Sequence, residues 1–498
     1  MSDFSIPPSS FVTRFDLWDD AQRDAAARML ATVREAGLTQ IRFSFPDQHG
    51  VLRGKTVTAA SLEEFLFSGC GMASTMLLKD TSHRTVYPVW QKSSGDFAGF
   101  SGAADFLLVA DPLTFRVLPW AEATGWVLCD AYDPSGHPVF CSTRLLARQA
   151  LGSVGVEVVY GHVVRIARIL EAGLEIELHI FRVIDPKLAA GDSGQPGTPP
   201  DVALCAQGFQ YLTEQRYDQH EPMFERIRKV CEALDLPLRT MEVEFGPSQV
   251  ELTFAPLRGI RIADDFMLLR SAVKQVCARH GYHATFMCRP ALPNIFSSGW
   301  HLHQSLAQLE DGRNAFAPET GGGRDTPPLS PLGMDFANGL LRHAEASCLL
   351  TTPTINGYKR YRPYSLAPDR ILMGRDNRAA MLRVISAPGS PASRIENRVG
   401  ESAANPYLYI TSQILSGLDG IDRPTPWPDV TEAPYETDAA SLPRNILAAI
   451  DSFAASDFYR ESLGTDVVDY LLMLKRAEAS RFFESVTDWE HKEYFDLF

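Results

Sequence analysis

The sequence Gly173-Leu174-Glu175-Ile176-Glu177-Leu178-His179 alternates apolar and polar residues with a period of two. That period is typical of a β-strand, in which successive side chains point to opposite faces. The leucines and the isoleucine therefore share one face, and the two glutamates and the histidine share the other. An exposed strand face would explain one such acidic pair, so the rest of the sequence must distinguish that explanation from a functional site.

The same pattern of Glu and His recurs in three later segments. Glu242-Val243-Glu244 is followed by Glu251, His301-Leu302-His303 offers two imidazoles, and Glu396 lies within Arg394-Ile395-Glu396-Asn397-Arg398. Strands that each present such residues can wall a barrel-like cavity, where carboxylates repel one another unless cations lie between them. Hard divalent ions, Mg²⁺ or Mn²⁺, suit this donor set better than zinc, because the sequence has no H-E-x-x-H motif and no cysteine cluster.

Composition excludes several classes of protein. The 498 residues include 47 Lys and Arg against 61 Asp and Glu, a formal net charge of −14, so nucleic acid is not an expected partner. The first residues lack a signal-peptide pattern and no stretch of about 18 apolar residues follows, so we expect a cytoplasmic protein with no membrane partner. The eight cysteines are scattered without a C-x-x-C pair, which indicates core thiols rather than disulfides.

Predicted helices and strands alternate along the chain. Helical spacing of apolar residues predicts helices over residues 18–36, 217–234, 264–280, 337–350 and 403–418 and a helical tail over 442–483. Residues 40–53 predict a β-hairpin that turns at Asp47-Gln48-His49-Gly50. Residues 314–331, with three consecutive glycines at 321–323, predict a flap.

A basic cluster follows the acidic pattern. Its residues are Asn356-Gly357-Tyr358-Lys359-Arg360, Arg378, Arg383, Arg394 and Arg398. Arginine forks suit carboxylates and phosphates, so arginines that converge on an acidic metal cavity indicate ATP together with an acidic substrate. A structural salt-bridge network is the alternative for any single one of them.

In this order the motifs resemble those of the glutamine synthetase family, and the resemblance covers nearly the whole chain. The markers are Phe45-Pro46-Asp47-Gln48-His49-Gly50-Val51-Leu52-Arg53-Gly54-Lys55, Glu175-Ile176-Glu177, Glu244-Phe245-Gly246-Pro247-Ser248-Gln249-Val250-Glu251, Ser298-Gly299-Trp300-His301-Leu302-His303-Gln304-Ser305-Leu306, Asn356-Gly357-Tyr358-Lys359-Arg360, and Arg394-Ile395-Glu396-Asn397-Arg398. The resemblance implies an α+β fold with an N-terminal β-grasp domain, residues 1–118, and a catalytic domain, residues 119–498, whose curved antiparallel sheet forms a half-barrel. It also implies a homo-oligomer, a dodecamer of two hexameric rings with active sites between subunits.

The resemblance also assigns roles to residues. It implies two or three Mg²⁺ or Mn²⁺ ions, one held by Glu177, Glu244 and Glu251 and another by Glu175, His301 and Glu396. Arg360 and Arg398 fall where the family binds L-glutamate. Arg378 and Arg383 fall where the family neutralises the ATP phosphates, and together with Arg360 they are the implied catalytic arginines. His303 and Ser305 fall beside the nucleotide. The implied reaction phosphorylates the γ-carboxylate of glutamate with ATP, and a small amine then displaces the phosphate.

The sequence departs from the family at one subsite, where ammonium is bound and deprotonated. Leu366, in Pro363-Tyr364-Ser365-Leu366-Ala367-Pro368, occupies the position of the proton-accepting Glu. Phe209 falls where the family has a Tyr, although Tyr211 lies two residues later, and Phe296 replaces an Asn. The loop that delivers an Asp from the neighbouring subunit has no clear equivalent, and Met72 to Asp80 is the nearest segment.

Loss of that Glu should impair the use of ammonium, which is mostly protonated at pH 7. An aromatic amine is already neutral, and apolar residues such as Leu366 and Phe209 would also bind its ring. The hypothesis is therefore a γ-glutamyl ligase of the γ-glutamylanilide type, which belongs to aniline degradation. Ligases for aliphatic amines or polyamines, an ammonia-using glutamine synthetase, a non-catalytic structural member and an unrelated metal-dependent hydrolase are the alternatives. Tyr435 lies roughly where some bacterial members are adenylylated, but its flanking residues match that motif poorly.

Overall fold

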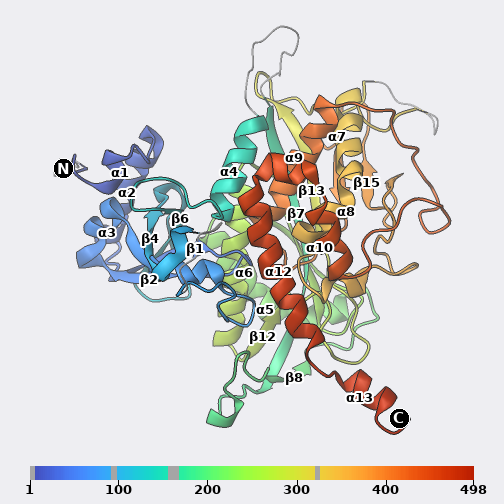
Figure 1. Cartoon of the computed structure of the whole chain (residues 1–498), viewed down its shortest axis with the longest axis horizontal. Coiled ribbons are helices and arrows are strands. Elements are labelled where there is room, and N and C mark those ends of the chain that lie inside the picture. The colour runs from blue at the N-terminus through green and yellow to red at the C-terminus, as the bar shows by residue number, and fades with distance from the viewer. Residues whose placement is uncertain (1–5, 91–97, 155–167, 320–325) are drawn as a thin grey trace.

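The computed structural model describes residues 6–90, 98–154, 168–319 and 326–498. Figure 1 shows a small N-terminal part, coloured blue to cyan, beside a larger part that contains most of the chain. Each part combines helices with a β-sheet, so the chain has the expected α+β fold. Of the predicted flap over 314–331, residues 320–325 lie outside the described residues.

The small part is built on a mixed sheet. Its strands lie in the order β2, β1, β6, β4, β3, and β5 also pairs with β6. The predicted hairpin is the antiparallel pair β1 and β2, and β1 lies parallel to β6, as in a β-grasp domain. The bounds are β1 (Gln40–Pro46), β2 (Leu52–Thr58), β3 (Cys70–Ala73), β4 (Asp105–Ala110), β5 (Arg116–Val117), β6 (Thr124–Tyr132), α1 (Phe11–Arg14), α2 (Asp20–Glu35) and α3 (Leu62–Ser68).

The larger part contains a curved sheet with β7 (Arg168–Asp185) at its centre. The strand order is β14, β15, β16, β13, β7, β10, β9, and β8, β11 and β12 pair with other segments of β7. All neighbours are antiparallel except β14 and β15. The other bounds are β8 (Asp201–Leu204), β9 (Leu238–Val243), β10 (Gln249–Phe254), β11 (Leu257–Arg258), β12 (Tyr282–Thr285), β13 (Trp300–Gln308), β14 (Met373–Arg375), β15 (Leu382–Ile385) and β16 (Arg394–Asn397).

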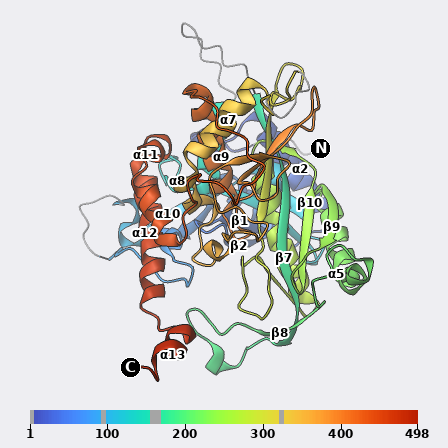
Figure 2. The same ribbon diagram turned by 90° about the vertical axis from the view of Figure 1, so that its right-hand side faces the viewer.

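Helices flank this sheet. Figure 2 shows α8 to α12 on one side of β7 and α5 on the other, beside β9. Their bounds are α4 (Thr143–Val154), α5 (Glu214–Ala233), α6 (Arg261–Arg279), α7 (Pro331–Arg342), α8 (Ala344–Thr351), α9 (Pro406–Asp422), α10 (Ile446–Ala454), α11 (Asp457–Leu463), α12 (Thr465–Phe483) and α13 (Asp488–Tyr494). Among the described helices, none is long and apolar enough to cross a bilayer.

The apolar face of β7 forms part of the core. Leu174, Ile176 and Leu178 are each at most 4% exposed. On the neighbouring strand β13, Trp300 is fully buried, and its ring stacks on Phe266 of α6 at 4.3 Å between centroids. Burying each Leu or Ile side chain contributes about 1.5–3 kcal/mol. This burial fixes the register of β7, because a shift by one residue would turn its glutamates into the core.

Arg144 of α4 connects the two parts. Its guanidinium group contacts the carboxylates of Asp111 (2.7 Å), Asp130 on β6 (2.9 Å) and Asp264 on α6 (2.8 Å). Removal of one partner from a buried group of this kind costs about 3–5 kcal/mol, because it leaves an uncompensated charge in the interior. The predicted domain division at residue 118 falls between β5 and β6 of the small sheet, and this division stays a prediction.

Candidate active site

Strand pairing brings the predicted acidic residues together. The register places Glu175 of β7 opposite His301 of β13, and Glu177 of β7 opposite Glu251 of β10. Directly opposed side chains on one sheet face have Cβ atoms about 4.5–5.5 Å apart, and like charges in such positions are destabilising. We refer to the residues that gather here, Glu175, Glu177, Glu244, Glu251, Glu396 and His301, as the acidic patch.

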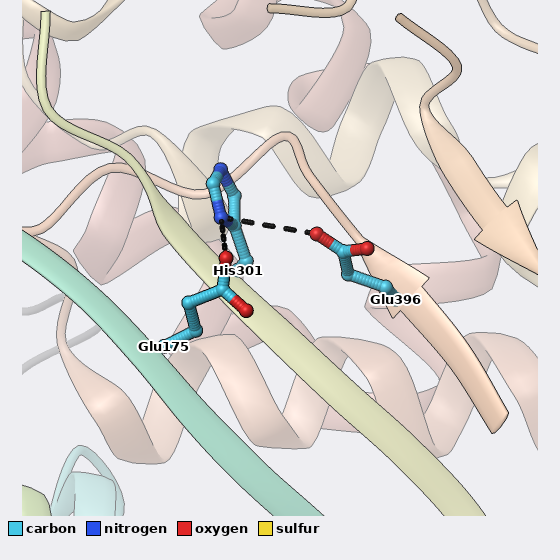
Figure 3. A group of neighbouring side chains, drawn as sticks. All are labelled: Glu175, His301 and Glu396. Atoms are coloured by element: carbon cyan, nitrogen blue, oxygen red, sulfur yellow. Dashed lines mark hydrogen bonds and ion pairs between the residues drawn. The ribbon is translucent and has the colours of Figure 1, made fainter. Parts of the chain in front are cut away.

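One group within the acidic patch is formed by Glu175, His301 and Glu396, which come from β7, β13 and β16 (Figure 3). His301 Nδ1 lies 2.9 Å from Glu175 Oε1 and 3.8 Å from Glu396 Oε1. One atom from each residue lies within 4.8 Å of the others. The three residues predicted to hold one metal ion are therefore neighbours.

A second group consists of Glu177, Glu251 and His301, again with one atom from each within 4.8 Å of the others. His301 Nε2 lies 3.7 Å from Glu177 Oε1. The predicted set had Glu244 with Glu177 and Glu251, and His301 only in the other set. Glu244 directly follows β9, and the charge of Glu177 acts on its carboxyl. The geometry thus adds His301 to the predicted neighbours of Glu177 and Glu251.

The hydrogen bonds of the two histidines define their tautomers. Arg360 Nη2 can only donate, so His301 Nε2 accepts from it (3.2 Å) and Nδ1–H donates to Glu175. In the same way His303 Nδ1 accepts from Arg394 Nε (3.0 Å), and its Nε2–H donates to Glu175 Oε2 (2.9 Å). Burial acts to raise the pKa of Glu175, yet the hydrogen bonds from both histidines outweigh it and hold that pKa well below its usual range.

Glu244 and Glu251 are repelled by their acidic neighbours. Burial, followed by the charges of Glu175 and Glu177, raises the pKa of Glu251 to about 11. Burial, followed by the charge of Glu177, raises the pKa of Glu244 to about 8. A divalent cation would replace this repulsion with attraction, and carboxylate oxygens with a minority of imidazole are donors for a hard cation. The residues of both groups therefore fit divalent ions.

Backbone and amide groups hold Glu177 in place. Its Oε2 accepts hydrogen bonds from Gln249 Nε2 (3.1 Å) and from the backbone N–H of Gly299 (3.0 Å). Its backbone carbonyl accepts from Ser402 Oγ, which also bonds to the carbonyl of Gly299. Such supporting contacts would orient Glu177 as a metal ligand.

Predicted arginines border the acidic patch. Arg398 Nη1 is paired with Glu396 Oε1, and Arg383 Nη1 lies 2.9 Å from Glu396 Oε2. Arg360 Nη1 donates to the carbonyl of Arg398 (2.6 Å), and Arg398 Nε donates to the carbonyl of Arg378 (2.9 Å). The charge of Arg398 holds the pKa of Glu396 below its usual value although burial opposes this. The structure thus brings Arg360, Arg383 and Arg398 to one edge of the patch, and Arg378 joins them through its backbone carbonyl.

A cavity of about 420 Å³ opens beside Glu175. Its lining includes His303 and Ser305, which were predicted to lie beside a nucleotide, together with Arg239 and Arg394. Two arginines with an adjoining acidic patch can hold a polyphosphate whose charge is shared with metal ions. His303 and Ser305 therefore meet the predicted metal ligand Glu175 in this cavity, whereas Arg378 and Arg383, also predicted to bind ATP, do not line it.

Aromatic side chains form a second wall, which we call the aromatic cluster: Phe209, Tyr211, Phe245 and Phe296. Phe209 and Phe296 meet edge to face at 5.7 Å, and Tyr211 stacks on Phe245 at 4.3 Å. Phe245 N–H donates to Glu244 Oε2 (3.2 Å), which places the cluster next to the acidic patch. Phe209 is 54% exposed and Phe296 42% exposed, so both rings are available to a ligand.

Leu366 lies on a loop beside Arg398. Its carbonyl accepts a hydrogen bond from Arg398 Nη2 (3.3 Å), and its side chain is 52% exposed. Tyr364 and Leu366 both have positive φ, 58° and 57°, a strained conformation for such side chains. Tyr435 anchors this loop, because its hydroxyl donates to the carbonyl of Ala367 (3.0 Å) and its ring contacts Tyr364.

Arg239, Tyr211 and Phe245 line or border the site without a role predicted from the sequence. A register shift between Thr253 and Phe254 on β10 changes which face Arg239 shares with its neighbours, and no sequence pattern indicates that shift. Phe245 follows Glu244 directly, so its position beside a predicted metal ligand was a signal that could have been used.

Comparisons with known proteins agree with this arrangement. Residues 168–494 match the family described as the glutamine synthetase catalytic domain. The chain is 41% identical to a gamma-glutamylanilide synthase of Acinetobacter sp., over 98% of this chain and 99% of the relative. It is 30% identical to a gamma-glutamylethanolamide synthetase of Streptomyces coelicolor, over 94% of each chain. A solved structure titled "Apo GmaS without ligand" is similar with a TM-score of 0.76 and 25% identity, covering 94% of this chain and 99% of that one.

Proposed function

The chain belongs to the glutamine synthetase family, and from this premise we propose that it joins the γ-carboxylate of L-glutamate to a neutral aromatic amine, with cleavage of ATP. It is an ATP-dependent carbon–nitrogen ligase. Its amine is the part of the proposal that depends on this chain's own residues. The observation that carries the choice of amine is Leu366 beside Arg398.

The acidic patch supplies the proposed metal site. Two or three Mg²⁺ or Mn²⁺ ions would be held, one by Glu177, Glu244 and Glu251 and another by Glu175, His301 and Glu396. When bound, such ions neutralise phosphate charge at the group being transferred. The raised pKa values of Glu244 and Glu251 support this assignment, because buried carboxylates in mutual repulsion favour a bound cation.

The arginines divide the substrates between them. Arg360 and Arg398 bind the carboxylates of L-glutamate, and both are at least 95% buried, where charge-assisted bonds are strong. Arg378 and Arg383 neutralise the phosphates of ATP and the transferred phosphoryl group. His303 and Ser305 hold the nucleotide in the 420 Å³ cavity.

The chemistry has two steps. An oxygen of the glutamate γ-carboxylate attacks the γ-phosphoryl group of ATP, which releases ADP and forms γ-glutamyl phosphate. The amine nitrogen then attacks the acyl carbon, phosphate leaves and the nitrogen loses a proton. The order follows from reactivity, because a carboxylate is a poor acyl donor until it is phosphorylated.

Leu366 determines which amine can complete the second step. Ammonium must lose a proton before its nitrogen can attack, and a leucine side chain cannot accept that proton. An aromatic amine carries a free lone pair at pH 7 and needs no base before attack. The 41% identical relative is named a gamma-glutamylanilide synthase, which supports the same choice.

The aromatic cluster supports the proposal independently of Leu366. Phe209 and Phe296 present half-exposed rings next to Glu244, and aromatic pairs gain about 0.5–1.5 kcal/mol beyond the burial of their area. An aniline ring can stack on or meet the edge of either side chain, whereas ammonia has no surface to bury there.

An aliphatic amine is the second candidate. The 30% identical relative is named a gamma-glutamylethanolamide synthetase. An aliphatic amine is protonated at pH 7, so its use would need a base other than Leu366.

An amine panel tests the proposal. Purified protein is incubated with L-glutamate, Mg·ATP and aniline, isopropylamine, ethanolamine, putrescine or ammonia, and phosphate release is followed together with product mass. We expect the fastest release and a γ-glutamylanilide mass with aniline. Faster release with ammonia or with an aliphatic amine would refute the aromatic acceptor, and release without an amide product would refute the ligase.

We also propose that the chain assembles as a dodecamer of two hexameric rings with active sites between subunits. The exposed aromatic cluster supports this, because large apolar side chains beside a catalytic site favour a covering surface.

A further inference from the structure

A second cavity, of about 520 Å³, lies where the turn between β1 and β2 meets helix α6. The turn contributes His49 to Leu52, and α6 contributes Met267, Arg270 and Lys274. The cavity shares no lining residue with the 420 Å³ cavity beside Glu175. It is therefore separate from the site proposed for ATP.

The lining of this cavity carries two positive charges that are not paired with a carboxylate in the described part of the chain. Arg270 and Lys274 are four residues apart on α6 and so share one face of the helix. Among the described residues neither has a carboxylate oxygen within 4.0 Å, and the lining contains no Asp or Glu. Asp47 acts on Arg270 through its charge, but its carboxylate is already paired with Arg53 at 2.6 Å.

Arg270 and Lys274 differ in how many of their N–H groups remain free to bind a ligand. Arg270 donates to the carbonyls of Gly50 and Ala404, so its guanidinium group holds the wall of the cavity together. Lys274 Nζ donates to the carbonyl of Ala284 (3.1 Å), which uses one of its three N–H groups. Lys274 therefore retains donors for a ligand, and Arg270 adds charge behind it.

The environment penalises both charges. Burial lowers the pKa of Arg270 to about 10, and burial together with the charge of Arg270 lowers the pKa of Lys274. An anion in the cavity would stabilise both cations, because opposite charge within about 4–6 Å favours the charged form.

The rest of the wall is apolar. Leu52, Met267 and Phe286 line the interior, while Val51, 50% exposed, and Met287, 42% exposed, stand at the rim. A hydrophobic pocket with a few convergent polar groups is the usual form of a small-molecule site. A ligand that satisfies both parts of this wall has an anionic head and an apolar body.

We propose that this cavity binds a small organic carboxylate with an aromatic or branched alkyl body, its carboxylate at Lys274 and Arg270 and its body against Met267 and Phe286. This site is distinct from the glutamate site at Arg360 and Arg398. It does not depend on which amine the enzyme uses.

Isothermal titration with benzoate tests the proposal on the full chain. Wild-type protein saturated with L-glutamate should bind benzoate, and benzyl alcohol, which has the ring without the charge, should bind at least tenfold more weakly. Lys274→Gln should weaken benzoate at least tenfold and Lys274→Arg should retain it. The matched control Lys229→Gln, on the surface of α5, should bind as wild type.

A second variant guards against misfolding of the first. Met287→Glu places a carboxylate at the solvent-exposed rim and should also weaken benzoate at least tenfold, with an unchanged far-UV circular dichroism spectrum. No benzoate binding by the wild type, binding that Lys274→Gln leaves unchanged, or binding that glutamate abolishes would each overturn the proposal.

Discussion

His301 lies between the two candidate metal-ligand groups, because each of its ring nitrogens faces a different carboxylate. Nδ1 is 2.9 Å from Glu175 Oε1, and Nε2 is 3.7 Å from Glu177 Oε1. A single imidazole can therefore influence both groups, and Arg360, which donates to Nε2, couples them to the proposed glutamate site. The metal ions and glutamate would be positioned by one connected set of side chains.

Replacement of Glu177 by Ala tests the acidic patch. The change removes a ligand held by Gln249 and Gly299, and we expect phosphate release to fall by at least ~100-fold, since even supporting residues of metal sites are worth 10–100-fold. The control Glu221→Ala, on the exposed face of α5, should keep full activity. Retained activity in Glu177→Ala would remove this residue from the metal site.

Glu401 gives a prediction about stability and pH. This buried carboxyl accepts hydrogen bonds from Thr354 N–H (2.7 Å) and Thr354 Oγ1 (2.8 Å), yet burial raises its pKa from 4.5 to about 7. The folded protein therefore binds this proton more tightly than the unfolded chain does. Its contribution to the free energy of unfolding is complete below pH 4.5 and is lost as the pH rises to about 7, a loss of roughly 3 kcal/mol.

Thermal unfolding of Glu401→Gln at pH 5 and pH 7.5 measures that contribution. The difference in Tm between wild type and variant should favour the wild type more at pH 5 than at pH 7.5. Glu214→Gln, at an exposed position on α5, should show the same difference at both pH values. An equal difference at both pH values for Glu401→Gln would contradict the raised pKa.

The acidic patch illustrates what could be predicted residue by residue. Glu175, Glu177 and His301 followed from a period of two on strands, because that period alone places side chains on one face. The position of Glu251 directly opposite Glu177 depends on the register of β10 against β7, which strand patterns do not contain.

At the scale of elements, α9 shows how a helix start positions the site. Asn405 caps α9 by accepting from the N–H groups of Tyr407 and Leu408, and its Nδ2 donates to the carbonyl of Asp47 in the β1–β2 turn (3.1 Å). The same residue therefore begins a catalytic-domain helix and contacts the N-terminal hairpin. The sequence predicted this helix from residue 403, and the cap explains why it begins at Pro406 instead.

Replacement of Asn405 by Ala should lower the free energy of unfolding by about 1–2 kcal/mol for the lost cap. The loss should exceed that of Asn445→Ala, which removes the cap of α10, because the Asn445 side chain oxygen caps Ala448 N–H alone. Thermal unfolding of both variants checks the order. A smaller effect at Asn405 than at Asn445 would show that the contact with Asp47 carries no stability.

The helix predicted over residues 337–350 is wrong in one respect, because the structure divides it into α7 and α8 at His343. His343 Nε2 lies 2.8 Å from Asp419 Oδ2, and its ring stacks on Phe458 at 3.7 Å. Both partners lie far along the sequence, so a local pattern could not indicate the break.

At the scale of the whole molecule, the C-terminal helix α13 projects from the body of the chain (Figure 1). The segment around it exposes large apolar side chains: Phe483 64%, Val486 79%, Trp489 61%, Phe495 76% and Phe498 96%. Apolar surface of this extent on a projecting helix favours burial against another subunit. This surface supports the proposed assembly of two rings.

Light scattering tests that assembly. Chains of 55.1 kDa in a dodecamer have a mass of about 660 kDa, which we expect for the full chain. Removal of residues 487–498 should reduce the mass to that of a hexamer or less, because α13 is lost. A monomeric full chain, or a truncated chain that keeps the dodecamer mass, would contradict the role of this helix.

The ratio of kcat/KM for aniline to that for ammonia, at pH 7 with saturating L-glutamate and Mg·ATP, tests the proposed function most directly. We predict a ratio above one for the wild type. Leu366→Glu, which restores a proton acceptor, should lower the ratio at least tenfold, whereas the control Leu366→Gln, of similar size without the acid, should not favour ammonia. A wild-type ratio below one would contradict a ligase for a neutral aromatic amine.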